Sequence, residues 1–138
     1  MIGIIRIKGR VSIDRDINQT LERLRLGRKY TCVVINPSKE QIGMIKKLRN
    51  FVAFGNINSE VFERLINARG QRIDKKKRVD AKVVIEGLNK GKKYEDLNLK
   101  PYFRLHPPRK GINSKFHFPK GVLGDNGEKI NDLVLRML

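Results

Sequence analysis

The chain contains few of the residues on which many enzyme sites and extracellular folds depend. It has 1 cysteine, 2 histidines and no tryptophan in 138 residues. The single cysteine, Cys32, excludes an internal disulfide and any zinc site built from several cysteines. His106 and His117 leave little for metal binding or a catalytic triad. We therefore expect no cofactor and no metal, and a reducing, intracellular compartment.

Long apolar runs are also missing. No stretch of about 18 apolar residues occurs, so we expect no membrane span. The first residues, MIGIIRIKGRV, carry arginine and lysine inside their apolar stretch, which is not typical of a signal peptide. We expect a cytoplasmic protein.

Acidic residues are scarce relative to basic ones. The chain has 31 Lys and Arg against 14 Asp and Glu, a net charge of +17. Such a surplus repels itself unless an anion neutralises it, and the usual anions are nucleic acids and acidic membranes. Residues 1–57 carry 12 cations and 4 acids (net +8), and residues 58–138 carry 19 and 10 (net +9). Because both halves are basic, we expect the whole body of the protein to meet its partner.

The first 57 residues show a β-α-β-α-β pattern. Strands are predicted at 2–11, 30–35 and 51–57, and helices at 14–26 and 38–48. Ser38 and Gln41 have the spacing of a capping box, and Asp14 is placed to cap the first helix. Gly43 lies inside the second predicted helix, where glycine is unfavourable, which suggests close packing at that point.

The first predicted strand has two different faces. Ile5 and Ile7 fall on one face, and Arg6, Lys8 and Arg10 fall on the other. The helices between the strands are expected to bury one face of the sheet. We expect the other face of this strand to stay cationic and to contact phosphates.

Residues 58–138 are predicted to form a mostly helical, basic extension packed on the 1–57 core as a single structural unit. Ser59 is placed to cap a helix that ends at Gly70, and Asp80 to cap a second, 81–88. A strand is predicted at 102–105. A last helix follows Asp125, with an apolar stripe at helical spacing that consists of Ile130, Leu133, Val134 and Met137.

The segment 69–82, RGQRIDKKKRVDAK, is the densest cluster of charge. It holds seven cations and two acids and has no apolar period. The run Lys75-Lys76-Lys77-Arg78 would repel itself in the free protein, and an RNA backbone would neutralise it. We favour RNA contact over a merely solvated loop.

The segment PYFRLHPPRKG, 101–111, raises the question of catalysis. His106 could serve as a general base, but a base needs an orienting carboxylate and a nucleophile, and no acid lies between residues 97 and 124. A structural histidine or an RNA contact is therefore favoured. Pro107 and Pro108 hold the backbone extended and fix where Arg109 and Lys110 point.

Two weaker motifs lie further along the chain. KFHFPK, 115–120, interleaves cations with aromatics that could stack on exposed bases, although a core role for one phenylalanine is equally compatible. Gly121, Gly124 and Gly127 do not match a phosphate loop, because Glu128 follows where that motif needs Lys-Ser/Thr. GDNG is better interpreted as a turn before the last helix, with only a weak similarity to the GxxG of KH domains.

The order of these segments resembles a known family. IIRIKGRV, LRLGRKYTCVVI and GMIKKLRNFVAFGNI, followed by FRLHPPRKG and LGDNGEKINDLVLRML, are similar to large-subunit ribosomal protein thirty of the archaeal type, the same family as the eukaryotic large-subunit protein seven. The likeness covers nearly the whole chain. It implies an α+β, ferredoxin-like core whose three-stranded sheet has the order 3-1-2. It also implies contact with large-subunit rRNA, including 5S rRNA, and with neighbouring ribosomal proteins, and no enzymatic activity.

We therefore expect a structural constituent of the large ribosomal subunit that braces rRNA through phosphate and shape contacts. The alternatives are an RNA-processing or ribosome-assembly factor with a basic platform and, less compatible with the mixed charge of the last helix, a membrane-surface binder. The predicted RNA-binding residues are Arg6, Lys8, Arg10, Arg69, Arg72, Lys75, Lys76, Lys77, Arg78, Arg104, His106, Arg109, Lys110, Lys115 and Lys120.

Overall fold

The computed structural model describes residues 1–8, 14–36, 38–109, 118 and 120–138. Its strands are β1 (Ile2–Arg6), β2 (Thr31–Ile35), β3 (Val52–Asn56), β4 (Phe103–Arg104) and β5 (Gly124–Asp125). Its α-helices are α1 (Arg15–Arg23), α2 (Lys39–Lys47), α3 (Ser59–Arg69), α4 (Ala81–Asn89) and α5 (Ile130–Met137). Two short 3₁₀ turns, η1 (Glu95–Leu97) and η2 (Gly127–Lys129), precede β4 and α5.

The sheet has five strands in the order β4-β2-β1-β3-β5, so the expectation of a three-stranded sheet is wrong. The central β2-β1-β3 unit has the predicted order, with β1 antiparallel to both neighbours. The extension adds β4 antiparallel to β2 and β5 parallel to β3. The strand predicted at 102–105 is confirmed as β4, although its pairing with β2 was not predicted. The two-residue β5 is too short to leave an alternating apolar pattern in the sequence.

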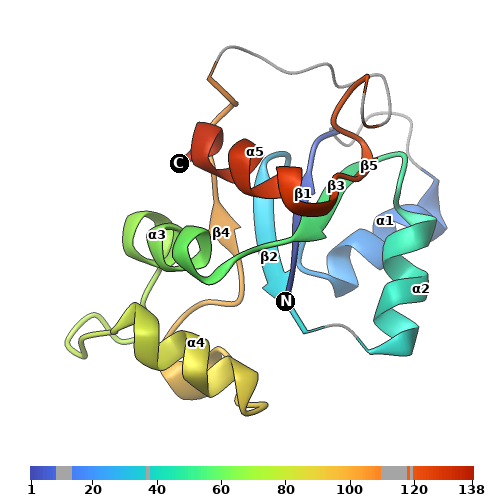
Figure 1. Ribbon diagram of the computed structural model, residues 1–138. Helices are drawn as coiled ribbons and strands as arrows, with labels where there is room; N and C mark the ends of the chain where they lie inside the picture. The colour runs from blue at the N-terminus through green and yellow to red at the C-terminus, as the bar shows by residue number, and fades with distance from the viewer. Residues whose placement is uncertain (9–13, 37, 110–117, 119) are drawn as a thin grey trace.

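Helices cover both faces of the sheet (Figure 1). On one face, Ile4 packs in a cluster with Leu21 of α1 and Ile45 of α2. On the other, Ile5 packs in a second cluster with side chains of α3, α4 and α5, among them Phe62 and Val134. Side chains of a strand alternate between the faces, so a run such as Ile4-Ile5 serves two separate clusters.

The prediction of a cationic open face on the first strand is therefore wrong. The helices that connect the strands lie over the face that carries Ile4 and Arg6, and the extension covers the face that carries Ile5 and Ile7. Arg6 has an exposed fraction of 0%. The alternation alone did not reveal that the distant extension, residues 58–138, covers the face of Ile5 and Ile7, so that the connecting helices cover the face of Arg6.

The helix starts agree with the predictions in two of four cases. The Ser38–Gln41 capping box is confirmed, and Asp80 accepts a hydrogen bond from the Lys82 amide, 3.0 Å away. The cap of α3 is Asn58, whose side chain accepts from the Val61 amide, rather than Ser59. Asp14 occupies the N-cap of α1 but forms no side-chain capping bond.

Gly43, which was predicted to pack closely against a neighbour, has open space around it. A Cβ added to Gly43 would have no atom within 4 Å, so the prediction of close packing there is wrong. The tight contact is at Gly55 on β3, where an added Cβ would lie 2.2 Å from the carbonyl oxygen of Gly127. Gly55 therefore lets η2 approach the sheet closely.

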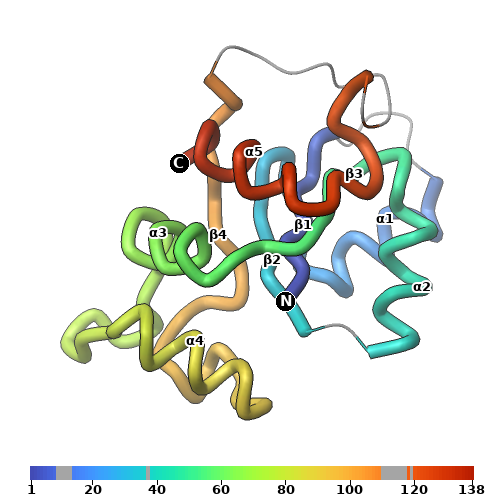
Figure 2. The backbone as a smooth tube through the Cα atoms, viewed as in Figure 1, coloured from blue at the N-terminus to red at the C-terminus, as the bar shows by residue number. Residues whose placement is uncertain are grey.

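After it forms α3 and α4, the extension returns to the edge of the sheet. From α4 the chain turns back through η1 and runs along the outer edge of β2 as β4 (Figure 2). The Tyr94 hydroxyl, before η1, donates to the Val34 carbonyl of β2. Cys32 of β2 is fully buried beneath this segment, and burial raises the pKa of its thiol to about 12. This cysteine is therefore a core residue with little thiolate.

Candidate nucleic-acid interface

The loop between α3 and α4, residues 70–80, is attached to the segment that precedes β4. A β-bridge joins Arg72 to Leu99, and the Lys100 amide donates to the Gln71 carbonyl over 2.8 Å. We call residues 70–80 the α3–α4 loop. Its backbone is paired although the sequence shows no apolar period here.

Asn98 holds the tip of the α3–α4 loop. Its side-chain oxygen accepts from the Asp74 amide at 2.7 Å, and its side-chain nitrogen donates to the Asp74 carbonyl at 3.0 Å and the Lys77 carbonyl at 3.4 Å. Its backbone adopts the left-handed conformation with φ 60°, which asparagine tolerates better than most residues. Sequence reasoning missed Asn98, because its partners lie more than twenty positions away.

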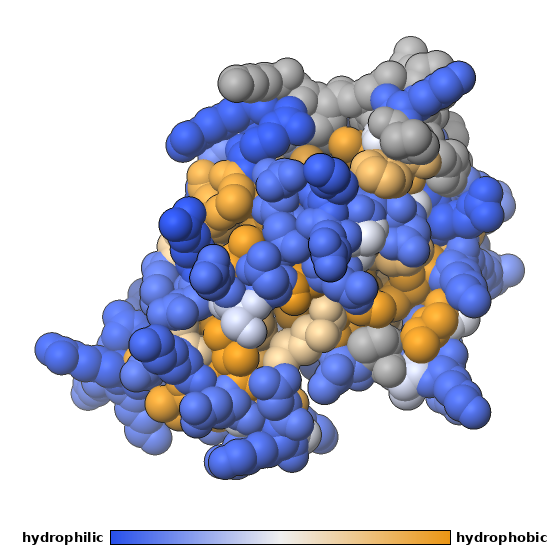
Figure 3. All heavy atoms as spheres, viewed as in Figure 1, coloured by the Kyte–Doolittle hydropathy of each residue, from blue (hydrophilic) through white to orange (hydrophobic). Residues whose placement is uncertain are grey.

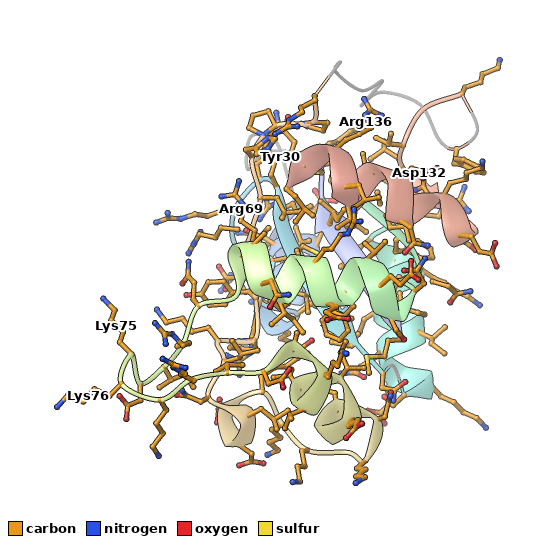
Figure 4. All side chains as sticks on the ribbon, turned by 60° about the vertical axis from the view of Figure 1, so that its left-hand side comes forward. Tyr30, Arg69, Lys75, Lys76, Asp132 and Arg136 are labelled. Carbon is orange, nitrogen blue, oxygen red and sulfur yellow. The ribbon has the colours of Figure 1, made fainter. Side chains whose placement is uncertain are left out.

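The cations of the α3–α4 loop are at the surface, and the Arg72 guanidinium also donates to the Lys77 carbonyl over 3.4 Å. Arg72 and the four residues Lys75 to Arg78 are exposed, whereas Arg69 at the end of α3 is half-buried. Lys75 and Lys76 project away from the body at the tip, and Arg69 lies on the same side of the molecule (Figure 4). The structure thus brings the predicted residues of 69–78 to one side.

A second group of predicted residues lies along the outer edge of the sheet. Arg104 of β4 is exposed, and its guanidinium lies 5.1 Å from the ring centroid of Tyr102. Arg109 is exposed, and hydrogen bonds join its backbone to α5. The Arg109 amide donates to the Arg136 carbonyl, and the Arg136 guanidinium donates to the Arg109 carbonyl. Tyr30 and Arg136 lie towards the same end of the molecule (Figure 4).

His106 has a structural environment. Its Nδ1 lies 2.6 Å from the Pro107 carbonyl oxygen, and its Nε2 lies 2.5 Å from that of Leu138. Its amide donates to the Met137 carbonyl. Both partners are main-chain oxygens, so neither contact is made by an Asp or Glu side chain of the kind that orients a catalytic base. The geometry favours a histidine that fastens the turn before Arg109 to the end of α5.

The remaining predicted residues have separate positions. Lys8 is exposed, with its Nζ 5.8 Å from the Phe51 ring centroid, and Lys120 is exposed. Arg6 is buried and not at the surface. Arg10, Lys110 and Lys115 lie outside the described residues. Sequence reasoning also missed Arg25 and Arg28, which line a cleft with Arg104.

Ion pairs are scarce in the part of the chain that the structure describes. Between those residues the structure has one ion pair, Arg25 to Glu95 at 3.9 Å. Hydrophilic side chains dominate the visible face, with small apolar areas between them (Figure 3). Such a surface suits a polyanion, which would neutralise many cations at once.

No group of three or more His, Cys, Asp or Glu side chains among the described residues is arranged to hold a metal ion. Within the same residues, none of the helices has the length and apolar character needed to cross a bilayer.

Comparison with known proteins connects this architecture to one family. The sequence model of ribosomal protein L30p/L7e matches residues 2–52, which cover β1 to the start of β3. Large ribosomal subunit protein uL30 of Archaeoglobus fulgidus is 40% identical over 99% of this chain and 99% of its own length. The chain belongs to the L30p/L7e family of ribosomal proteins.

Other archaeal L30p/L7e relatives match over similar lengths. The uL30 proteins of Nanoarchaeum equitans and Pyrobaculum aerophilum are 38% and 37% identical, over 100% and 99% of this chain and over 99% and 93% of their own lengths. The extension beyond residue 57 is therefore shared with these relatives. Membership of L30p/L7e confirms the resemblance noted in the sequence, and this family is a structural component of ribosomes and not an enzyme family.

Proposed function

We propose that this L30p/L7e protein is a structural constituent of the large ribosomal subunit that binds and braces ribosomal RNA through phosphate and shape contacts. The relatives' name, large ribosomal subunit protein uL30, supports the assembly into which it fits. Duplex RNA offers little sequence code in its deep groove, so the contacts are to backbone and shape.

The observation that carries the proposal is the α3–α4 loop. It presents Arg72 and the run Lys75 to Arg78 to solvent on a backbone already fixed by Asn98. Holding four adjacent cations in one exposed loop is unfavourable in the free protein, and RNA phosphates would relieve the repulsion. A fixed backbone also lowers the entropy lost on binding.

The RNA partner in this proposal is large-subunit rRNA, with 5S rRNA as one of its parts. Lys8, Arg69, Arg104, Arg109 and Lys120 would extend the contact beyond the loop. Neighbouring ribosomal proteins are further partners, and the exposed apolar side chains Ile42 (38%) and Phe118 (40%) offer a surface for them. Residues 1–57 and 58–138 would act as one unit in this role, since both contribute strands to the same sheet.

Sedimentation tests the role directly. The full chain, added to large-subunit precursors depleted of it, is expected to co-sediment with mature large subunits at moderate salt and to leave them gradually as salt rises. An assembly factor would appear on precursors and be absent from mature subunits. Recovery of the chain only among free soluble proteins at every salt concentration would contradict the proposal.

A binding assay separates the RNA partners. Purified chain is titrated against 5S rRNA, against large-subunit rRNA, and against an unrelated RNA of equal length. We expect tighter binding to at least one ribosomal RNA than to the control. Equal affinity for all three would contradict shape-specific recognition.

A further inference from the structure

A cleft of about 280 Å³ lies between the loop that joins α1 to β2 and the edge strand β4. We call residues 24–30 the α1–β2 loop. The cleft is lined by three arginines, Arg25, Arg28 and Arg104, together with Tyr102 and one acid, Glu22. All three arginines are exposed. None of the contacts already described uses Arg25 or Arg28 for RNA.

The α1–β2 loop is held in place by the buried Arg6. The Arg6 guanidinium donates to the Leu26 carbonyl over 2.7 Å, and the Arg6 carbonyl accepts the Tyr30 amide over 2.7 Å. Arg6 therefore fixes Leu26 and Tyr30, the two ends of a five-residue stretch of the loop. Arg6, which the sequence suggested as a phosphate contact, lies beneath the loop that carries the exposed arginines.

The backbone of the α1–β2 loop is unusual at two non-glycine residues. Arg25 and Tyr30 have φ values of 63° and 64°, in the left-handed region. L-residues adopt this region only where the surroundings enforce it, and such positions cluster at binding sites. At Arg25 the left-handed backbone belongs to the end of α1, where the Leu26 amide donates to the Leu21 carbonyl, and at Tyr30 the Arg6 carbonyl accepts the amide.

The chemistry of the cleft matches a phosphodiester. Guanidinium groups bind phosphate oxygens through two parallel N–H donors, and their flat faces stack on aromatic rings. Arg104 lies over the Tyr102 ring in this way, 5.1 Å from its centroid. Thr31 pairs with Arg104 in the sheet, so β4 and the α1–β2 loop are fixed relative to each other.

The acidic side chains near the cleft do not neutralise its arginines. Arg25 faces Glu95 at 3.9 Å, but the two side chains are 56% and 63% exposed, and pairs this exposed are weak. Glu22 is exposed on the last turns of α1. Three guanidinium groups against these two carboxylates leave net positive charge for an anion.

We propose that this cleft is a phosphodiester clamp for ribosomal RNA, with Arg28 and Arg104 as its contacts and Arg6 as the residue that positions its loop. The inference rests on the proposed function, since it names a second contact between the same protein and RNA. It commits to RNA because planar arginines beside an aromatic ring suit phosphate and base together, whereas an acidic peptide would need only charge.

The test uses the full chain with transcribed large-subunit rRNA at several KCl concentrations. The clamp variant carries Arg28→Gln and Arg104→Gln. The matched control carries Lys46→Gln and Arg49→Gln, two exposed cations at the α2 end of the molecule. The clamp variant is expected to bind about tenfold more weakly, the value for about one charged hydrogen bond. Its log K against log salt slope should fall by roughly one unit per cation.

Each other outcome overturns the clamp. Equal losses in the clamp and control variants would mean that only total charge counts. Normal rRNA binding by the clamp variant, combined with failure to enter large subunits, would assign the cleft to an acidic protein. Both of these outcomes leave the proposed function standing. A wild-type chain that binds no ribosomal RNA would remove the proposed function and the clamp together.

Arg6 is tested separately because its loss also affects folding. Arg6→Met keeps every exposed cation and removes the donor to Leu26, so we expect a weaker complex and a lower salt slope. Arg6→Lys, which retains a donor, should recover part of the slope. Gly55→Ala serves as a destabilised control away from the cleft, and its slope should equal that of the wild type. An unchanged slope in folded Arg6→Met would overturn the positioning role.

Discussion

The α3–α4 loop carries four consecutive cations at its tip, whereas the α1–β2 loop carries Arg25, Arg28 and Lys29 separated by Leu26 and Gly27. The first is fixed by an asparagine side chain at the surface, and the second by a buried arginine. Charge density alone identified the first loop. The second was invisible to that criterion, because its residues become a cluster only when β4 lies beside them.

The difference between the loops is also one of geometry. Lysine ammonium groups on long, flexible stems in the α3–α4 loop suit general attraction to a polyanion. Arginines on a constrained backbone in the α1–β2 loop suit a contact of fixed direction. The comparison predicts that the first loop controls mainly the salt dependence of binding and the second also controls its specificity.

The largest expected effect comes from removing the charge of the α3–α4 loop. A variant with Lys75, Lys76, Lys77 and Arg78 all changed to Gln should lose roughly 3 units of log K against log salt slope. All four side chains are exposed, so its stability should stay within about 0.5 kcal/mol of the wild type. Filter binding across a KCl series and urea unfolding measure the two quantities.

The single variants Lys75→Ala and Lys76→Ala calibrate this result, because each should lower the slope by roughly one unit. An unchanged slope in the four-site variant would place the α3–α4 loop away from RNA. The contrast between the two loops in RNA binding would then no longer hold.

The next effect concerns the support of the α3–α4 loop rather than its charge. Asn98→Ala removes three hydrogen bonds and places alanine at a left-handed φ, which should cost about 2 kcal/mol of unfolding free energy. Asn98→Gly keeps the backbone conformation accessible and should lose less. Urea unfolding of both variants measures the difference.

RNA binding by the Asn98 variants separates support from charge. Every cation is still present, so the salt slope should change far less than in the four-site variant. Faster hydrogen exchange at the Lys76 and Lys77 amides should accompany the change. Equal stability of the Ala and Gly variants would contradict the role of the left-handed backbone.

A smaller pair of effects tests whether stability and affinity are independent. Gly55→Ala would push a methyl group against the Gly127 carbonyl oxygen and should destabilise the fold by about 1–3 kcal/mol. Gly43→Ala has open space around it and should stabilise α2 by about 1 kcal/mol. Thermal unfolding measures both changes.

Neither glycine variant alters a cation, so both should keep the wild-type salt slope. A slope that follows stability across the two variants would show that the other RNA-binding effects are consequences of folding. The contrast between the two loops would then need another explanation.

Local patterns in the sequence predicted the parts of the fold that depend on neighbours in the chain. The Ser38–Gln41 capping box and the apolar stripe of α5 are set by residues within one or two turns, and both are present. The features that sequence reasoning missed depend on distant partners. The buried Arg6 donates to the Leu26 carbonyl, twenty positions away, and Asn98 pairs with Asp74, twenty-four positions away.

The candidate site follows the same division. The exposed run at Lys75 to Lys77 could be predicted because a charge run needs no partner to be recognised. The cleft could not, since it depends on the pairing of Arg104 with Thr31, which the strand predicted at 102–105 did not specify. Family resemblance supplied the order of the central strands but not the two added edges.

The short edge strands limit how the free protein can associate with other copies of itself. A long exposed edge strand can pair with the same strand of another molecule and so begin aggregation. Here β4 and β5 occupy the two edges, and each is only two residues long. Arg104 and Asp125 place an exposed charge on each. A free copy of this basic chain therefore offers other copies very little backbone to which they could add a strand.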